Sequence, residues 1–257
     1  MNEYKLLKLQ RFDDGVALVT LDNPPLNLMS PDMLYELRDT LVALGNDDTM
    51  RSIVLTGSQR AFCAGADVNT FKTFPRDMNT VIGQSIYNSI ENVRVPIIAA
   101  IEGHCLGGGL ELALCCDIRY ASETAKIGLT EANLSLIAAY GGMTRLPWLI
   151  GEANAKRMFY TAARLSGQEA KEYGLVQEVC QPEELIDKAL ELAHLIATKA
   201  PRSIAAAKQV FHQFREELFA AGMRREDRGS LFACRCEDGK EGILALKEKR
   251  QPVFKNK

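Results

Sequence analysis

Two stretches of small residues near the middle of the chain each end at an acid. The first covers residues 64–67 and ends at Asp67, and the second covers residues 107–111 and ends at Glu111. Each follows an apolar run (53–55 and 95–101) that is typical of a buried strand. Because small residues let a ligand approach the backbone, peptide N–H groups in such loops can point at it.

Loops of this kind on neighbouring strands can each supply one N–H group to the same oxygen, which is the geometry of an oxyanion hole. A second glutamate, Glu131, follows Glu111 along the chain. An oxyanion hole with two carboxylates beside it suggests acid–base chemistry on a carbonyl compound through an enolate.

Other interpretations of these residues are open at this point. The glycines are also compatible with tight packing between a strand and a helix. Residues 103–108 lack the spacing of a dinucleotide-binding loop, and no Gly-Lys-Ser/Thr triplet follows them. Taken alone, Glu111 and Glu131 are also compatible with acids that stabilise the first turns of helices.

The bulk composition is that of a globular enzyme. The chain has 257 residues, of which 47% are hydrophobic and 25% charged, with a formal net charge of −2. That balance argues against nucleic acid as the main partner. No apolar run has membrane-spanning length and the first residues do not resemble a signal peptide, so we expect a cytoplasmic protein with no membrane association.

The cysteine count points to reduced thiols. There are seven cysteines, an odd number, and several lie inside apolar runs, which favours free core thiols over a disulfide framework. The pair Cys234 and Cys236 invites a metal interpretation but has no second motif to complete a ligand set. We therefore expect no metal site.

Hydrophobic periodicity predicts alternating strands and helices. Strands are expected at 16–21, 53–56, 97–101, 118–121 and 125–128, and helices from Ser30 with an apolar stripe at 34, 37, 41 and 44, at 80–92 and at 110–116. This alternation implies an α/β fold in which helices connect parallel strands. After Gly151 the pattern becomes mostly helical.

Several segments of the chain resemble motifs of a known family. Segments 63–68, 96–103, 107–112, 141–146, 170–176 and 248–254 resemble, in order, motifs of the enoyl-CoA hydratase/isomerase (crotonase) family. The resemblance implies a spiral of strand-strand-helix turns in residues 1–195, which carries an acyl-CoA site. It also implies a helical C-terminal region, residues 196–257, that builds trimers, often paired into hexamers, and contributes to the CoA site.

The resemblance also assigns roles to the residues. The N–H groups of Ala66 and Gly108 would hold the thioester oxygen of an acyl-CoA. Glu111 would take a proton from water as its oxygen adds to the β-carbon, and Glu131 would deliver one to the α-carbon, or the pair would share these transfers. Because both acids are present, the resemblance favours an enoyl-CoA hydratase, a lyase of fatty acid metabolism. The alternatives are an isomerase, a 3-hydroxyacyl-CoA dehydratase, a thioester hydrolase or a non-catalytic acyl-CoA-binding protein.

The substrate-binding residues follow from the same resemblance. The CoA and acyl portions would lie against the residues Leu26, Ala64, Asp67, Val68, Asn69, Tyr140 and Lys249. Asn69 stands where the family commonly has a lysine. The triplet 138–140 (Ala-Ala-Tyr) replaces a Pro-Gly-Ala-like triplet, and Tyr140 adds bulk with a polar tip. No metal or redox cofactor is implied, because CoA arrives as part of the substrate.

Overall fold

The computed structural model describes residues 4–70 and 76–256. Its strands form two sheets. The larger sheet has the order β1-β2-β3-β5-β7-β9, in which only the pair β1–β2 is antiparallel. Its strands are β1 (Leu7–Arg11), β2 (Val16–Leu21), β3 (Ser52–Thr56), β5 (Ile97–Ile101), β7 (Ile118–Ser122) and β9 (Glu178–Cys180).

The smaller sheet is parallel throughout and has the order β4-β6-β8. Its strands are β4 (Ala61–Cys63), β6 (His104–Leu106) and β8 (Lys126–Gly128). Along the chain, the strands of the small sheet follow β3, β5 and β7 one by one. The chain therefore winds through both sheets in repeated strand-strand-helix turns, as expected for the α/β spiral.

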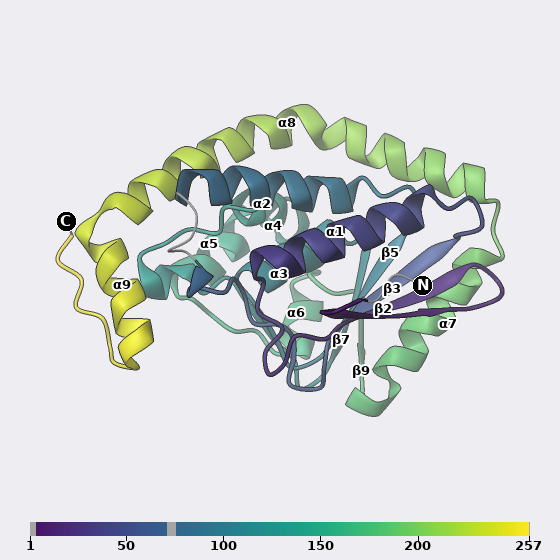
Figure 1. The fold of residues 1–257 in the computed structure, drawn as a ribbon, viewed down its shortest axis with the longest axis horizontal. Helices are drawn as coiled ribbons and strands as arrows, with labels where there is room; N and C mark the ends of the chain where they lie inside the picture. Colours follow the sequence, from purple (N-terminus) through teal and green to yellow (C-terminus); the bar gives the residue numbers. More distant parts are fainter. Residues whose placement is uncertain (1–3, 71–75, 257) are drawn as a thin grey trace.

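Helices cover both faces of the larger sheet (Figure 1). The helices are α1 (Pro31–Asn46), α2 (Arg76–Glu91), α3 (Gly108–Cys115), η2 (Glu131–Leu134), α4 (Gly142–Ile150), α5 (Glu152–Tyr160), α6 (Gly167–Glu172), η3 (Pro182–Glu184), α7 (Leu185–Ala197), α8 (Pro201–Arg235) and α9 (Glu237–Glu248). Helix α7 packs on one face of the sheet through Ala189 and Ala193, against Val54 and Ile98. The long helix α8 runs over α2 on the opposite side, and α9 turns back at its end (Figure 1).

Helix α1 forms as its sequence predicts. The Ser30 hydroxyl caps it by accepting a hydrogen bond from the Met33 amide at 3.2 Å, and Pro31 occupies the first turn, where its missing N–H is not needed. The buried stripe includes Leu34, Leu37, Leu41 and Leu44. This spacing turns one face of α1 toward the core.

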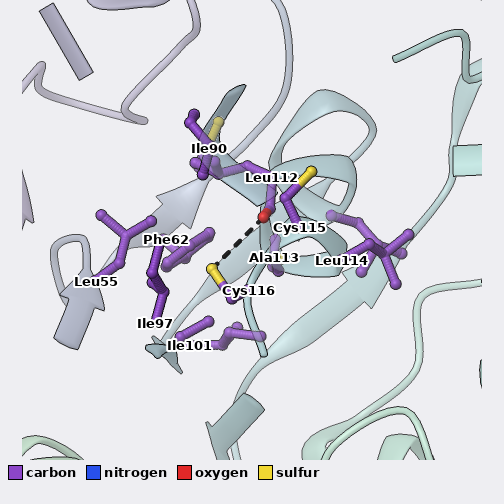
Figure 2. Close-up of a cluster of buried hydrophobic side chains, with 14 of the residues drawn as sticks. Leu55, Phe62, Ile90, Ile97, Ile101, Leu112, Ala113, Leu114, Cys115 and Cys116 are labelled. Atoms are coloured by element: carbon purple, nitrogen blue, oxygen red, sulfur yellow. Dashed lines mark hydrogen bonds between the residues drawn. The ribbon is translucent and has the colours of Figure 1, made fainter. Parts of the chain in front are cut away.

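Helix α3 lies at the centre of the main core. All of its residues are buried, and apolar side chains from strands β3 and β5 and helix α2 surround it (Figure 2). Cys115 and Cys116 act as small apolar residues there, and the Cys116 thiol lies 3.6 Å from the Leu112 carbonyl. Because a close-packed interior resists displacement, any side chain that α3 carries is held in a fixed place.

The strands that deliver the two small-residue loops differ from the sequence-based expectation. The runs 53–55 and 95–101 do form neighbouring strands, β3 and β5. The loops, however, follow the three-residue strands β4 and β6, which come after β3 and β5 respectively in the chain. Such short strands carry too few residues for a recognisable alternation, so their pairing becomes visible only in the fold.

Candidate active site

The two predicted N–H donors lie next to each other at the ends of β4 and β6. A Cβ atom added to Gly108 would lie 3.6 Å from the Ala66 nitrogen, and one added to Gly65 would lie 3.9 Å from the Gly108 nitrogen. Within residues 4–70 and 76–256, no acceptor takes the N–H of Ala66 or of Gly108. Both residues line the same cavity, so two free donors face it together.

The local backbone explains why glycine is needed here. Gly107, at the N-terminus of α3, has φ 53°, a left-handed conformation that residues with a side chain rarely adopt. The Tyr87 hydroxyl, fully buried on α2, donates to the Gly108 carbonyl at 2.8 Å and fixes the peptide that follows. The start of α3 is therefore positioned by the glycine turn and by a side chain from a neighbouring helix.

Glu111 occupies the first turn of α3 and is 2% exposed. Its Oε1 accepts two backbone hydrogen bonds, from the amides of Tyr140 at 2.7 Å and Gly142 at 2.9 Å. In the described part of the chain no donor reaches Oε2, and Glu111 lines the cavity. One oxygen is thus held by the protein, while the other is available to a substrate or to water.

Glu131 begins the short helix η2 and lies over the same loop. A Cβ atom added to Gly107 would come within 3.0 Å of its Oε1. Its Oε2 is buried and has no hydrogen-bond partner among the described residues. A buried carboxyl oxygen without a partner costs free energy, and such groups are typical of functional sites rather than of structural ones.

The surroundings raise the pKa of both acids. Burial, followed by the charges of Glu131 and Glu226, raises the pKa of Glu111 well above its ordinary value, against the opposing effect of the two N–H bonds. Burial raises the pKa of Glu131 to about 7. Two carboxyl groups that interact in this way titrate as a pair, so near neutral pH they retain a shared proton.

A cavity of about 950 Å³ connects these groups. Of the residues predicted for the site, eight line it: Leu26, Ala64, Ala66, Val68, Gly108, Glu111, Glu131 and Tyr140. Its walls also include Thr80 from α2, Ser230 from α8 and Leu246 from α9, so the C-terminal helices of this chain close one side of it. Among predicted residues, Asp67, Asn69 and Lys249 do not line the cavity.

The tyrosine of the divergent triplet 138–140 is accommodated by a glycine. Tyr140 packs against α2, where a Cβ atom at Gly83 would lie 2.3 Å from its ring, and its ring centroid is 5.2 Å from that of Tyr87. The Tyr140 amide still reaches Glu111. The loop therefore keeps its contact with the acid while a bulkier side chain fills space beside the cavity.

The residues predicted to contact CoA are less closely grouped than those around the two acids. Asp67 accepts hydrogen bonds from the backbone and side-chain amides of Asn69, each at 3.0 Å, which shapes the loop. Lys249 ends helix α9 in a left-handed conformation, φ 54°. Its neighbour Arg250 lines the cavity instead and pairs with Glu241. The role of Lys249 stays a prediction.

Three basic residues that the sequence analysis missed also line the cavity: Arg60, His104 and Arg164. They gather because β4 pairs with β6 and β6 with β8, which places Ala61 opposite His104, while Ile127 of β8 is bridged to Leu165. Residues this far apart carry no common spacing, and only the pairing of the short strands would have identified them.

Across residues 4–70 and 76–256, no group of three or more His, Cys, Asp and Glu side chains is arranged to hold a metal ion. No helix in those same ranges is both long enough and apolar enough to cross a membrane.

Comparisons with known proteins show the family to which the chain belongs. The sequence profile of the family described as enoyl-CoA hydratase/isomerase matches residues 11–257. A probable enoyl-CoA hydratase of Bacillus subtilis is 39% identical over 95% of this chain and 96% of its own, and a crotonyl-CoA hydratase of Syntrophomonas wolfei is 34% identical over 95% and 96%. The crystal structure of an enoyl-CoA hydratase from Bacillus anthracis superimposes with a TM-score of 0.79 at 35% identity, covering 98% of this chain and 100% of that one. The chain therefore belongs to the enoyl-CoA hydratase/isomerase family and has the crotonase fold.

Proposed function

We propose that the protein is an enoyl-CoA hydratase, which adds water across the 2,3 double bond of a 2-enoyl-CoA. The observation that carries this proposal is the pairing of two carboxyl groups of raised pKa, Glu111 and Glu131, in one cavity with two free N–H donors. Shuttling a proton between carbons needs one acid, whereas adding water needs a second group to position and deprotonate it.

In the proposed reaction, the thioester oxygen accepts hydrogen bonds from the amides of Ala66 and Gly108. As the water oxygen bonds to the β-carbon, one carboxylate takes the proton that the water loses, and the electrons of the double bond move toward the thioester oxygen. The two N–H groups stabilise this enolate, aided by the N-terminus of α3. The other carboxyl group gives a proton to the α-carbon, so the net change is the addition of one water molecule.

The pair of acids, rather than either one alone, performs both transfers. In this proposal Glu111 takes the proton of water once the shared proton has passed to Glu131, which lines the same cavity. This exchange fits the assignment of Glu131 to the α-carbon. It also fits the raised pKa values, because groups that titrate near the working pH exchange protons most effectively.

We further propose that CoA enters as part of the substrate, with no separate cofactor, and that the protein works in the cytoplasm as a trimer or a dimer of trimers. The C-terminal helices leave large apolar side chains exposed, among them Val210, Phe211 and Phe232 on α8. An interface between copies would bury such residues. Light scattering that gave a stable monomer at micromolar concentration would overturn the assembly.

The experiment that tests the function is a panel of trans-2-enoyl-CoA and 3-enoyl-CoA thioesters of increasing chain length, with the products identified by mass spectrometry. We expect the 2-enoyl substrates to gain one water molecule. Fast conversion of 3-enoyl to 2-enoyl thioesters with poor hydration would instead identify an isomerase. Turnover of no thioester would remove the catalytic assignment.

A further inference from the structure

A third buried carboxylate lies behind the candidate active site. Glu226, on the long helix α8, is 4% exposed and does not line the cavity. It follows Glu111 by more than a hundred positions in the chain, yet its charge is among the causes that raise the pKa of Glu111. Burying a carboxylate is costly unless it is well hydrogen-bonded, so its partners show what it does.

Those partners are backbone and side-chain groups at the start of α4. The Glu226 Oε2 accepts from the Gly141 amide at 2.8 Å, and its Oε1 accepts from the Thr144 hydroxyl. The amides on either side, of Tyr140 and Gly142, donate to Oε1 of Glu111. Three consecutive N–H groups thus alternate between two carboxyl groups, one from α3 and one from α8.

The turn that carries these amides requires glycine. Gly141 has φ 100°, and a Cβ atom there would lie 1.7 Å from the Arg145 guanidinium. This left-handed residue points its own N–H away from those of its two neighbours. The acid from α8 therefore fixes the middle of the turn, while Glu111 receives the bonds at its two sides.

The other charged groups near Glu226 are accounted for. From α4, the Arg145 guanidinium favours its charged form, but it is also paired with Glu91 of α2, with Nη2 and Oε2 2.6 Å apart. From α3, Glu111 faces it across the turn. Burial outweighs these attractions and raises the pKa of Glu226 to about 7.

We propose that Glu226 is a positioning residue for the catalytic pair: it holds the 140–142 turn in place and thereby orients Glu111, and its negative charge resists the ionisation of Glu111. Only the expected changes in kcat and in the pH dependence of kcat/KM rest on the proposed hydratase function. The orientation of the turn is a property of the folded protein whatever the reaction.

Two substitutions separate the two parts of the proposal. Glu226→Gln keeps the size, and because a threonine hydroxyl can accept as well as donate, the amide can still bond the Gly141 amide and the Thr144 hydroxyl. Its main effect is therefore to remove the charge. Glu226→Ala removes the charge and both hydrogen bonds. Glu172→Gln removes one charge at an exposed position of helix α6, away from the cavity, and serves as the matched control.

For Glu226→Gln we expect the alkaline limb of kcat/KM against pH to move to lower pH by about half a unit, because a repelling charge is lost and the acid pair gives up its shared proton more easily. For Glu226→Ala we expect kcat to fall about tenfold with KM nearly unchanged, because Glu111 loses its orientation while substrate contacts remain. Glu172→Gln should match the wild type in both measurements. An unshifted limb in a folded Glu226→Gln variant would overturn the charge effect.

Hydrogen–deuterium exchange tests the positioning role without any activity. In Glu226→Ala, a peptide covering residues 138–146 should exchange about tenfold faster than in the wild type, while peptides from α1 and the large sheet stay protected. Unchanged protection of 138–146, or unchanged kcat, would overturn the positioning role. If the wild type hydrates no thioester, the function fails on its own, and the exchange result still decides whether Glu226 holds the turn.

Discussion

Glu111 and Glu131 are the same residue type in the same cavity, but the protein holds them in different ways. Glu111 stands on α3, whose residues are all buried, and two backbone amides grip one of its oxygens. Glu131 stands at the start of a four-residue 3₁₀ helix with no buried residues, and one of its oxygens is buried without a hydrogen-bond partner among the described residues.

This difference shows how the same carboxyl group can be held in one fixed orientation at one position and left open to proton exchange at another. Hydrogen bonds to one oxygen fix the direction of Glu111, so its free oxygen has one place to act. Glu131 has an oxygen that only a substrate, a water molecule or a proton can satisfy. We infer that the packed core supplies the orientation of the pair, and that the looser helix supplies an acid that readily exchanges its proton.

The largest expected effect comes from removing the carboxyl groups. Glu111→Gln and Glu131→Gln should each lower the rate of hydration by about 10²–10⁴, the usual contribution of a general acid or base, because an amide takes no proton from water. Glu131→Gln should also suppress exchange of the α-proton with solvent deuterium, followed by NMR. Thioester binding should survive in both, since Ala66 and Gly108 contribute backbone groups. Equal α-proton exchange in the wild type and Glu131→Gln would break the assignment of Glu131.

A smaller effect is expected from a substitution that displaces the Glu131 side chain but leaves its carboxyl group intact. Gly107→Ala places a methyl group 3.0 Å from its Oε1, and a displacement of this kind should lower kcat about 10-fold to 100-fold. Gly151→Ala is the matched control, because it has a left-handed φ of 77° but nothing within 4 Å of the added Cβ atom. Both variants should lose similar stability in thermal unfolding. Equal kcat in the two would show that the contact with Glu131 is unimportant.

The smallest effect is on stability against pH. A carboxyl group whose pKa is raised to about 7 in the folded state favours folding below its ordinary pKa, near 4.5, and this contribution is lost as the pH rises through 7. Between pH 5 and 8, the free energy of unfolding of Glu131→Gln should therefore fall less than that of the wild type. The difference should be on the order of 1 kcal/mol per unit of pKa shift, measured by urea unfolding. Parallel curves for the two proteins would contradict the raised pKa.

The sequence was sufficient for the parts of the site that local pattern determines. The Ser30 cap, the stripe of α1 and the two small-residue loops are all contiguous signals, and the structure brings residues of both loops to one cavity with Glu111 and Glu131. Each of these features depends on neighbours within a few positions in the chain. Patterns of that range are readable without knowing the fold.

The remaining features depend on contacts between distant segments. Strands β4 and β6 are too short to show alternation. In the sequence, Glu226 is indistinguishable from other charged residues of an amphipathic helix, and its role depends on the packing of α8 against α2 and α4. The contact between Tyr140 and Gly83 likewise brings together a loop and a helix that are more than fifty residues apart in the chain. No local pattern carries this information.

The central claim is that the two acids act as one unit, and a double substitution tests it most directly. The rate of crotonyl-CoA hydration would be measured for the wild type, Glu111→Gln, Glu131→Gln and the double variant, all at saturating substrate. Because groups that act together lose their effect together, the double variant should be about as slow as the slower single variant. A double variant slowed by the product of the two single effects would show that the acids act independently and would contradict the account.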